Sequence, residues 1–231
     1  MRNVGKASAT LLAAFAPLCA LLLLGPTTGQ ARGKMPEVSH DGLHLVKGKG
    51  FAALYLKPGA SLAPYDELVI LDCFVAFKKN WQRDQRELDH RVTAKQMDAI
   101  KTQLAKEFNK IFVKELQDKG GYKVVTAGAR NVMILRPAII NLDVVAPDSV
   151  SDVDEQTFSA SAGQMTLYME LYDSVTNDII ARIIDPESAQ GSGMIQWRNE
   201  VTNTAEADRI LRRWADTLRR QLDDAHKRTA P

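Results

Sequence analysis

Cysteine is scarce in this chain. The 231 residues contain two cysteines, and Cys19 lies in an apolar N-terminal run that we expect to be absent from the mature protein. Cys73 would then be the only cysteine left, which excludes an internal disulfide and any site built from paired cysteines. Because Cys73 stands within an apolar stretch, we expect it to be a small buried side chain.

A surplus of charge is also missing. The chain has 30 Lys and Arg against 28 Asp and Glu. Arg2 and Lys6 are the only charged residues among the first 31, so 28 basic residues remain against 28 acidic ones once that segment is removed. Binding to nucleic acid requires a basic surplus. We therefore expect no nucleic-acid partner.

No hydrophobic run is long enough to cross a membrane as a helix. The apolar run Leu11–Leu24 has 14 residues, whereas a spanning helix needs about 20. A basic start, this run and small residues up to Ala31 are typical of a secretory signal peptide. We predict that residues 1–31 are a signal peptide cleaved near Ala31 and that the mature chain is periplasmic or secreted. Retention of this segment as a membrane anchor is the alternative.

Attachment of a lipid is not expected. It requires an apolar residue three positions before the cysteine and a small residue directly before it. Cys19 follows Ala16, Pro17 and Leu18, which fit this pattern badly because Leu18 is not small.

The mature sequence divides into an arm, a domain and a tail. Residues 32–64 are rich in Gly and Pro, which predicts an irregular N-terminal arm with one short extended piece at 51–56. Residues 65–226 form a single predicted α/β domain, and residues 227–231 form a frayed tail. The domain begins with a strand over Tyr65–Lys78, which is apolar on both sides and therefore favours a central position.

Two amphipathic helices are predicted. Thr93 and Gln96 fit a capping box at the start of the first, and Gly120-Gly121 fits its end. Apolar residues at three- and four-residue spacing follow Thr93, and a second such stripe follows Asn203, which we expect to cap the last helix. Each helix has a single apolar face, so each needs a sheet to cover it.

The clearest hairpin signal covers residues 163–184. Met165, Leu167, Met169 and Leu171 alternate with polar or aromatic residues, which predicts a strand with one buried face. Asp173-Ser174 and Asn177 favour a turn, because the first pair can hydrogen-bond backbone amides and asparagine tolerates left-handed backbone. Short strands at Tyr122–Thr126 and Val132–Val145 precede the hairpin. Pro137, inside the second of these, predicts an edge, a bulge or a strand start.

These elements predict an α+β fold, an α/β sandwich. Its sheet would be mixed but largely antiparallel, with about five strands packed by two long amphipathic helices. The antiparallel hairpin and the consecutive strands after the first helix argue against a doubly wound parallel sheet.

No set of residues predicts catalysis. Ser39-His40-Asp41 has the residue types of a hydrolytic triad, with His44 nearby, but three consecutive residues cannot converge on one another. We interpret them as a turn. Asp89-His90 could act as a general base, yet no nucleophile accompanies it, so a surface position is favoured.

Metal and phosphate sites are not predicted either. The acidic residues after Val145 lack the fixed spacing and the glycine of a calcium loop, so we interpret them as a solvated loop. They are Asp148, Asp152, Asp154 and Glu155. No glycine-rich phosphate loop is present. We therefore expect no catalytic, cofactor-binding or metal-ligating residues and no cofactor.

The last helix is rich in arginine, which suggests a phosphate- or membrane-binding face. However, an acidic residue stands four positions before several of the basic ones, the spacing of stabilising helix pairs. These pairs are Asp208–Arg212, Asp216–Arg220, Asp223–Lys227 and Asp224–Arg228. We expect a salt-bridged solvent face.

Short motifs give the chain a family resemblance. They are Ser39-x-Asp41-Gly42-Leu43, Tyr65, Gly163-x-Met165-x-Leu167, Asp173-Ser174-x-Thr176-Asn177-Asp178 and Trp214-Ala215. On these residues the mature chain resembles an uncharacterised family of bacterial envelope proteins, many of them lipid-anchored, known as domain of unknown function 3313. The chain departs from the family in lacking a usable lipidation site and in having Asn177 where glycine is expected. The resemblance implies an envelope location and no catalytic residues.

Three functional hypotheses follow. The leading one is a periplasmic, non-enzymatic accessory or binding protein whose partner is another envelope protein or the envelope surface. The second is a hydrolase that uses a histidine with a nearby acid, and the third is a carrier with a small-ligand pocket between the sheet and residues 146–162. The positions of His40, His44 and His90 relative to a pocket, a carboxylate and a nucleophile separate the first two.

Overall fold

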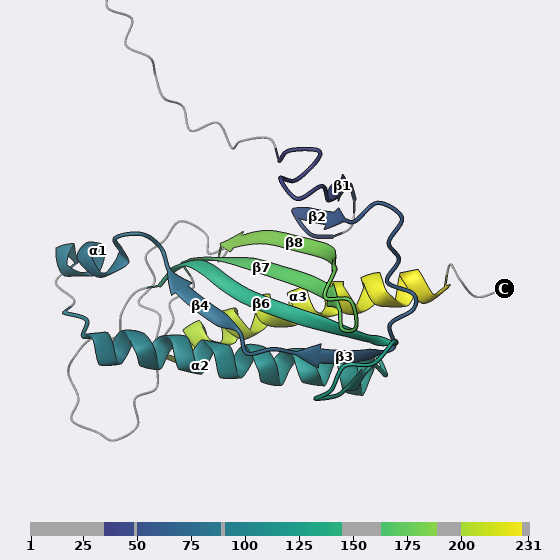
Figure 1. Ribbon diagram of the computed structural model, residues 1–231. Coiled ribbons are helices and arrows are strands. Elements are labelled where there is room, and N and C mark those ends of the chain that lie inside the picture. The colour runs from purple at the N-terminus through teal and green to yellow at the C-terminus, as the bar shows by residue number, and fades with distance from the viewer. Residues whose placement is uncertain (1–34, 49, 89–90, 145–162, 189–199, 228–231) are drawn as a thin grey trace, which may run out of the picture. The chain divides into compact units, whose positions relative to one another are not determined.

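The computed structural model describes residues 35–48, 50–88, 91–144, 163–188 and 200–227 (Figure 1). The chain divides into two units, Met1–Lys34 and Met35–Pro231, and every described residue belongs to the second. Among the described residues, no helix is both long enough and apolar enough to cross a membrane. The elements are β1 (His44–Val46), β2 (Ala53–Leu56), β3 (Glu67–Ile70), β4 (Phe74–Phe77), α1 (Trp81–Glu87), α2 (Ala94–Val113), the π-helical turn η1 (Lys114–Lys119), β5 (Lys123–Val124), β6 (Val132–Asp143), β7 (Gln164–Asp173), β8 (Ile179–Ser188) and α3 (Glu200–Lys227).

The strands of the described residues form one mixed sheet. Its order is β1-β2-β8-β7-β6-β3-β5, and β4 pairs with β6 further along the same side as β3. The pairs from β1 to β6 are antiparallel, whereas β3, β4 and β5 are joined through parallel pairs. The long strands β6, β7 and β8 lie side by side in the middle of the sheet (Figure 1).

The hairpin of β7 and β8 has the predicted turn. The Oδ1 atom of Asp173 accepts hydrogen bonds from the backbone amides of Val175 and Thr176, at 2.8 and 2.7 Å. Asn177 has a φ of 57°, in the left-handed region. The predicted buried set of β7 is confirmed, with exposed fractions of 6% or less. Its members are Met165, Leu167, Met169 and Leu171.

Pro137 lies inside β6, opposite a break in the neighbouring strand. β3 pairs with β6 as far as Leu135, and β4 resumes the pairing at Ala138. The amide of Leu71 donates to the carbonyl of Leu135 at 2.9 Å, so the backbone of Leu135 faces β3. Backbone direction alternates along a strand, so the nitrogen of Pro137, which has no hydrogen to donate, faces the same side. The single strand predicted for Tyr65–Lys78 is therefore two strands.

α2 and α3 pack against one face of the sheet (Figure 1). α2 begins at the predicted capping box, where Thr93 Oγ1 accepts from the amide of Gln96 at 3.2 Å and Gln96 Oε1 accepts from the amide of Thr93 at 2.8 Å. The helix continues through η1 and stops before Gly120, as predicted. The buried helix residues of this core are Ile100, Leu104, Phe108, Ile111, Phe112, Leu116, Ile210, Leu211, Trp214, Leu218 and Leu222.

The predicted fold class is wrong in its proportions. The sequence predicts about five strands under two long helices, but the described residues form an eight-stranded mixed sheet and three α-helices. β2 lies within the extended piece predicted at 51–56. β1 was missed because it lies in an arm rich in Gly and Pro, where extended chain is stabilised only by pairing within the sheet. α1, Trp81–Glu87, was missed because it is polar apart from Trp81 and so has no apolar stripe.

Two boundaries also differ from the predictions. The predicted hairpin ended at residue 184, but β8 runs to Ser188. α3 begins at Glu200, so Asn203 lies inside the helix and is not its cap. α3 ends at Lys227, the first residue of the predicted tail, and the rest of that tail lies outside the described residues. The extended piece predicted at 194–197 lies outside the described residues.

Candidate functional site

The residues of the sequence triad do not form a catalytic arrangement. Ser39 Oγ donates to Asp41 Oδ1 at 2.6 Å and accepts from the amide of Leu43 at 2.9 Å, which makes a tight turn before β1. The side chain of His40 is 85% exposed and its Nδ1 lies 3.9 Å from Asp41. His44 is exposed at the start of β1. The interpretation of this segment as a turn is confirmed.

Asp41 is instead paired with Arg182 of β8. The guanidinium donates to both carboxylate oxygens of Asp41, at 2.9 and 2.6 Å, and to Oε1 of Glu170 at 3.0 and 3.2 Å. Tyr168 and Tyr172 donate their hydroxyl hydrogens to the two oxygens of Glu170, at 3.0 and 2.7 Å. We call these five residues the Arg182 cluster. It lies on the face of the sheet opposite α2 and α3.

The electrostatics of the Arg182 cluster are those of a stable ion network. The hydrogen bonds from Arg182 and then from Ser39 hold the pKa of Asp41 well below its usual range. Burial opposes ionisation of Glu170, yet the hydrogen bonds it accepts keep its pKa below the ordinary value. Both carboxylates are therefore ionised and committed to partners, and neither is placed to exchange protons with a substrate. The cluster fastens the segment before β1 to the sheet.

The arginines of α3 are paired, as predicted, but not all of them face solvent. Arg212 and Arg220 form the predicted pairs with Asp208 and Asp216, both at 2.9 Å. By contrast, Arg219 turns inward and donates to Glu115 of η1, a side chain that is only 5% exposed.

The two remaining predicted pairs of α3 have different outcomes, and one contact was not predicted. The carboxylate of Asp223, predicted to pair with Lys227, accepts from Arg219 and Tyr122 instead, at 2.8 and 2.9 Å. The predicted partner of Asp224, Arg228, lies outside the described residues. Arg213 donates to the buried carboxylate of Asp185 at 2.8 Å.

Several sequence candidates cannot be placed. Asp89, His90 and the acidic residues from 148 to 155 lie outside the described residues. Within the described ranges, no group of three or more His, Cys, Asp or Glu side chains could hold a metal ion.

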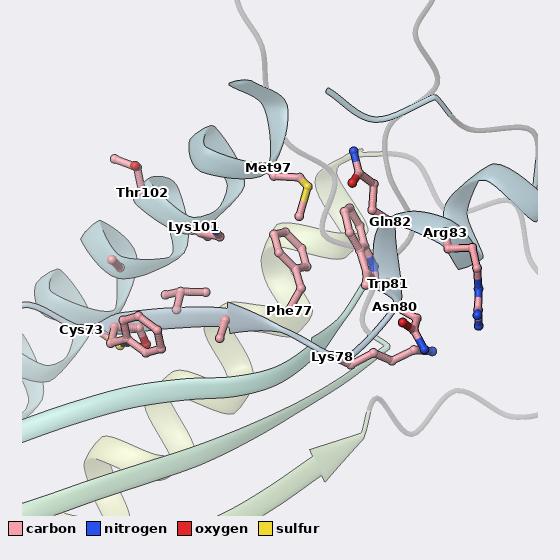
Figure 2. A pocket seen from close by; sticks show the side chains of 14 residues that line it. Cys73, Phe77, Lys78, Asn80, Trp81, Gln82, Arg83, Met97, Lys101 and Thr102 are labelled. Carbon is pink, nitrogen blue, oxygen red and sulfur yellow. Dashed lines mark hydrogen bonds between the residues drawn. The ribbon is translucent and has the colours of Figure 1, made fainter. Parts of the chain in front are cut away.

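A groove lies beside β4, between this strand, α1 and α2. Its volume is about 750 Å³. Asn80, with a left-handed φ of 65°, turns the chain from β4 into α1 and brings Trp81 to one end of the groove. Trp81 stacks on Phe77 with ring centroids 4.0 Å apart. Figure 2 shows these two rings and Met97 of α2 gathered in the groove.

Trp81 is a fixed part of this wall and not an adaptable surface residue. It is 1% exposed, and its indole Nε1 donates to the carbonyl of Val144 at 2.7 Å. Cys73 also lines the groove and is buried, as predicted. Burial raises the pKa of its thiol to about 12, so the sulfur stays protonated and is not a nucleophile.

The strand that borders the groove has an open edge. β4 pairs with β6 along one edge, and within the described residues no strand pairs with the other. Phe74 stands on this strand and is 65% exposed, while Leu71 just before it is 41% exposed. An open edge with exposed apolar side chains is a template for pairing with another polypeptide segment.

The groove was not predicted from the sequence. The alternation around Phe74 predicted a strand covered on both faces, and the polar stretch containing Trp81 gave no helix signal. One clue was present. A lone tryptophan in a polar segment needs an apolar contact, and Trp81 obtains it from Phe77, four residues earlier.

A second cavity lies near the ends of the segment expected to border a ligand pocket. Leu104, Val144, Gly163 and Met165 are among its lining residues. Its volume in the described structure is about 20 Å³, which is room for about one water molecule. It offers no support for a small-ligand carrier.

The comparisons with known proteins add a family. The sequence matches the profile described as "Protein of unknown function (DUF3313)" over residues 38–218. No curated protein matches it. Among solved structures, a methionine-substituted variant of the PelC dodecamer from Paraburkholderia phytofirmans shares 13% identity, at a TM-score of 0.36, and the alignment covers 72% of this chain and 95% of that one. The PelC dodecamer itself, from the same organism, shares 12% identity at a TM-score of 0.35, and the alignment covers 72% of this chain and 96% of that one. A likeness this weak says nothing about what this chain does.

Proposed function

We propose that this chain, which belongs to the DUF3313 family of proteins of unknown function, is a non-enzymatic binding protein of the bacterial envelope. It holds an extended segment of a partner protein in the groove beside β4. The observation that carries the proposal is the open edge of β4 next to that groove.

An open strand edge binds polypeptide by a general mechanism. Its unpaired backbone groups form ladder hydrogen bonds with an added strand, and pockets beside the edge select side chains. The groove supplies such a pocket, because the partly exposed Phe77 and Met97, backed by the buried Trp81, line it with apolar atoms. Binding would also remove Phe74 from water. A side chain of this size, when fully buried, contributes about 1.5–3 kcal/mol.

The state of the ionisable side chains supports a non-enzymatic role. His40 and His44 are exposed and belong to the β1 segment, and neither lines the groove. The groove contains one thiol, Cys73, which stays protonated. The Arg182 cluster binds its own carboxylates, and the neighbouring hydroxyl of Ser39 donates its hydrogen to Asp41.

The envelope location rests on the N-terminal sequence. Arg2 and Lys6 precede the apolar run Leu11–Leu24, and small residues follow, which is the pattern of a secretory signal. Export would place the groove in the periplasm. The partner would then be another envelope protein.

Site-specific photo-crosslinking in intact cells tests the proposal. A photoreactive amino acid replaces Phe74 at the edge of the groove. We expect a discrete adduct with an envelope protein, with the crosslinked residue inside a segment that adds to β4. The identified protein, once purified, should bind the chain in solution, and Phe74→Ser should weaken that binding.

Val175 provides the control position. It is 59% exposed, comparable with Phe74, but lies on the turn of the hairpin. The same photoreactive residue there should not give the adduct. Equal adducts at both positions, or none at position 74, would contradict the proposal, as would hydrolytic activity that is lost in His40→Ala or His44→Ala.

A further inference from the structure

The charge of the groove walls restricts which segment fits the groove, if the proposed function holds. The lining includes three cationic side chains, Lys78, Arg83 and Lys101, and no carboxylate. A second hollow of about 490 Å³ continues along α2 and shares lining residues with the first. It adds Lys106 and Lys110 against one acid, Asp72. The groove is therefore basic, in a chain that is otherwise balanced in charge.

The basic residues differ in how far they are already neutralised. Lys78 forms ion pairs with Asp143 at 2.7 Å and with Asp84 at 3.4 Å, so its charge is largely neutralised within the chain. Lys101 contacts only Asp98, at 3.3 Å, and the Asp98 side chain is 73% exposed. Lys106 is exposed and forms no ion pair with any described residue. Arg83 of α1 is paired with Asp84 at 3.2 Å and with Glu87 at 3.8 Å. Lys106, the groove lysine without an ion pair among the described residues, therefore places available positive charge on the α2 wall.

Side chains alternate between the two faces of β4, and this alternation determines which side chains of an added strand would face α2. Cys73 and Val75 belong to the core beneath the helices, so Phe74 points to the opposite face of the sheet. An added strand alternates in the same way. Every second side chain would face α2 and its lysines, and the others would lie on the face of Phe74.

We infer that the occupant of the groove is an acidic polypeptide segment that alternates carboxylates with apolar residues. The carboxylates face Lys101 and Lys106 of α2, while the apolar side chains cover Phe74 and β4 pairs with the backbone. The segment then contacts both β4 and α2, and its carboxylates lie opposite the lysines of α2 across the interface.

Binding of two synthetic peptides to the full chain tests this inference. The first alternates glutamate with valine, and the second alternates lysine with valine. Nuclear magnetic resonance titration of the labelled chain follows the backbone amides of β4 and α2. We expect saturable shifts there with the glutamate peptide, weakened by added salt because the charges are exposed. The lysine peptide should leave these amides unchanged.

Charge reversal on α2 provides the matched pair of variants. Lys101→Glu with Lys106→Glu should weaken the glutamate peptide at least about tenfold, which corresponds to about 1.4 kcal/mol. Lys95→Glu with Lys114→Glu makes the same change at two exposed positions that do not line the groove. It should leave the affinity within about twofold of the original. The helix content of both variants is checked by circular dichroism.

The outcomes separate this inference from the proposed function. If both peptides bind equally, or if neither shifts β4, while position 74 still gives its adduct, the groove is used but its occupant is not acidic and the inference fails. If position 74 gives no adduct either, both fail. An adduct between two copies of this chain, or with another segment of the same chain, would also overturn the inference.

Discussion

Arg182 and Asp41 form a bidentate ion pair across 141 residues of sequence. Both carboxylate oxygens of Asp41 accept from the guanidinium, and Arg182 is 6% exposed. Geometry of this kind gives the stronger class of ion pair, because two parallel hydrogen bonds fix both groups. The pair attaches the segment before β1 to the middle of the sheet.

Asp41→Asn should make the stability of the protein less dependent on pH. The native pKa of Asp41 lies below its ordinary value of 3.8, so the unfolded chain takes up a proton first as the pH falls. The ionised carboxylate therefore stabilises the fold at pH 7, and this contribution is lost progressively below about pH 5. We expect Asp41→Asn to lose roughly 1–3 kcal/mol at pH 7 and less at pH 3, where the carboxylate is partly protonated in the unfolded chain but still ionised in the native pair, as measured by urea unfolding.

Asp98→Asn is the control for that experiment. Asp98 forms a single exposed pair with Lys101, and such pairs contribute about 0–1 kcal/mol. Its unfolding curves should follow those of the unmodified chain at each pH. If Asp41→Asn loses the same stability at pH 3 as at pH 7, the ion pair does not have the assigned role.

Gly163→Ala should destabilise the fold, because the added methyl group has no room. A Cβ atom on Gly163 would collide with the backbone oxygen of Asp143, on the neighbouring strand. Backbone must move to admit it, and overpacking of this kind costs about 1–3 kcal/mol. Thermal unfolding measures the loss. Gln164→Ala, at the exposed next position, should stay within about 0.5 kcal/mol of the original, and equal effects at the two positions would contradict the close approach.

Asn177 should be replaceable by glycine but not by alanine. Its φ of 57° is left-handed, a conformation that costs an ordinary residue about 1–2 kcal/mol and glycine almost nothing. Asn177→Gly should be neutral or slightly stabilising in thermal unfolding, and Asn177→Ala should lose about 1 kcal/mol. A loss above about 1 kcal/mol in the glycine variant would refute the left-handed assignment for the turn.

Leu104→Ala should lose about 2–5 kcal/mol, because it opens a cavity between α2 and the sheet. Leu104 is 8% exposed and belongs to the main core. Urea unfolding gives the value. The neighbouring Gln103 is exposed, so Gln103→Ala should change the free energy of unfolding little, and a result within error for Leu104→Ala would show that this helix face is not buried.

Local signals in the sequence predicted the elements that local chemistry determines. The capping box of Thr93 and Gln96, the turn at Asp173 and Asn177, and the alternation of β7 depend on residues within a few positions of one another, so they were found. β1 was not found, and β2 was predicted only as a short extended piece, because β2 is held in the sheet by β8, which lies more than 120 residues later. The paired arginines of α3 were predicted where both partners lie on the helix, as with Asp208 and Arg212.

The interior arrangement could not be predicted from one sequence. Pro137 signalled an irregularity, but the break it meets lies in β3 and β4, which come more than 60 residues earlier. Asp41 was singled out for its neighbours Ser39 and His40, whereas its partner is Arg182. The groove beside β4 depends on the positions of α1 and α2 relative to the open edge of that strand. The spacing of residues along the sequence does not determine these positions.

The distance in sequence between β2 and β8 also determines the order in which the sheet assembles. β7 and β8 are joined by a hairpin, and 20 residues lie between the end of β6 and the start of β7, so the contacts among these strands are closer in sequence and form earlier. β2 joins β8 through pairings such as Ala53 with Ile184, 131 residues apart, and closing so long a loop costs entropy. The arm should therefore be the last part to dock and the first to open, and its amides should exchange with solvent faster than those of the central hairpin.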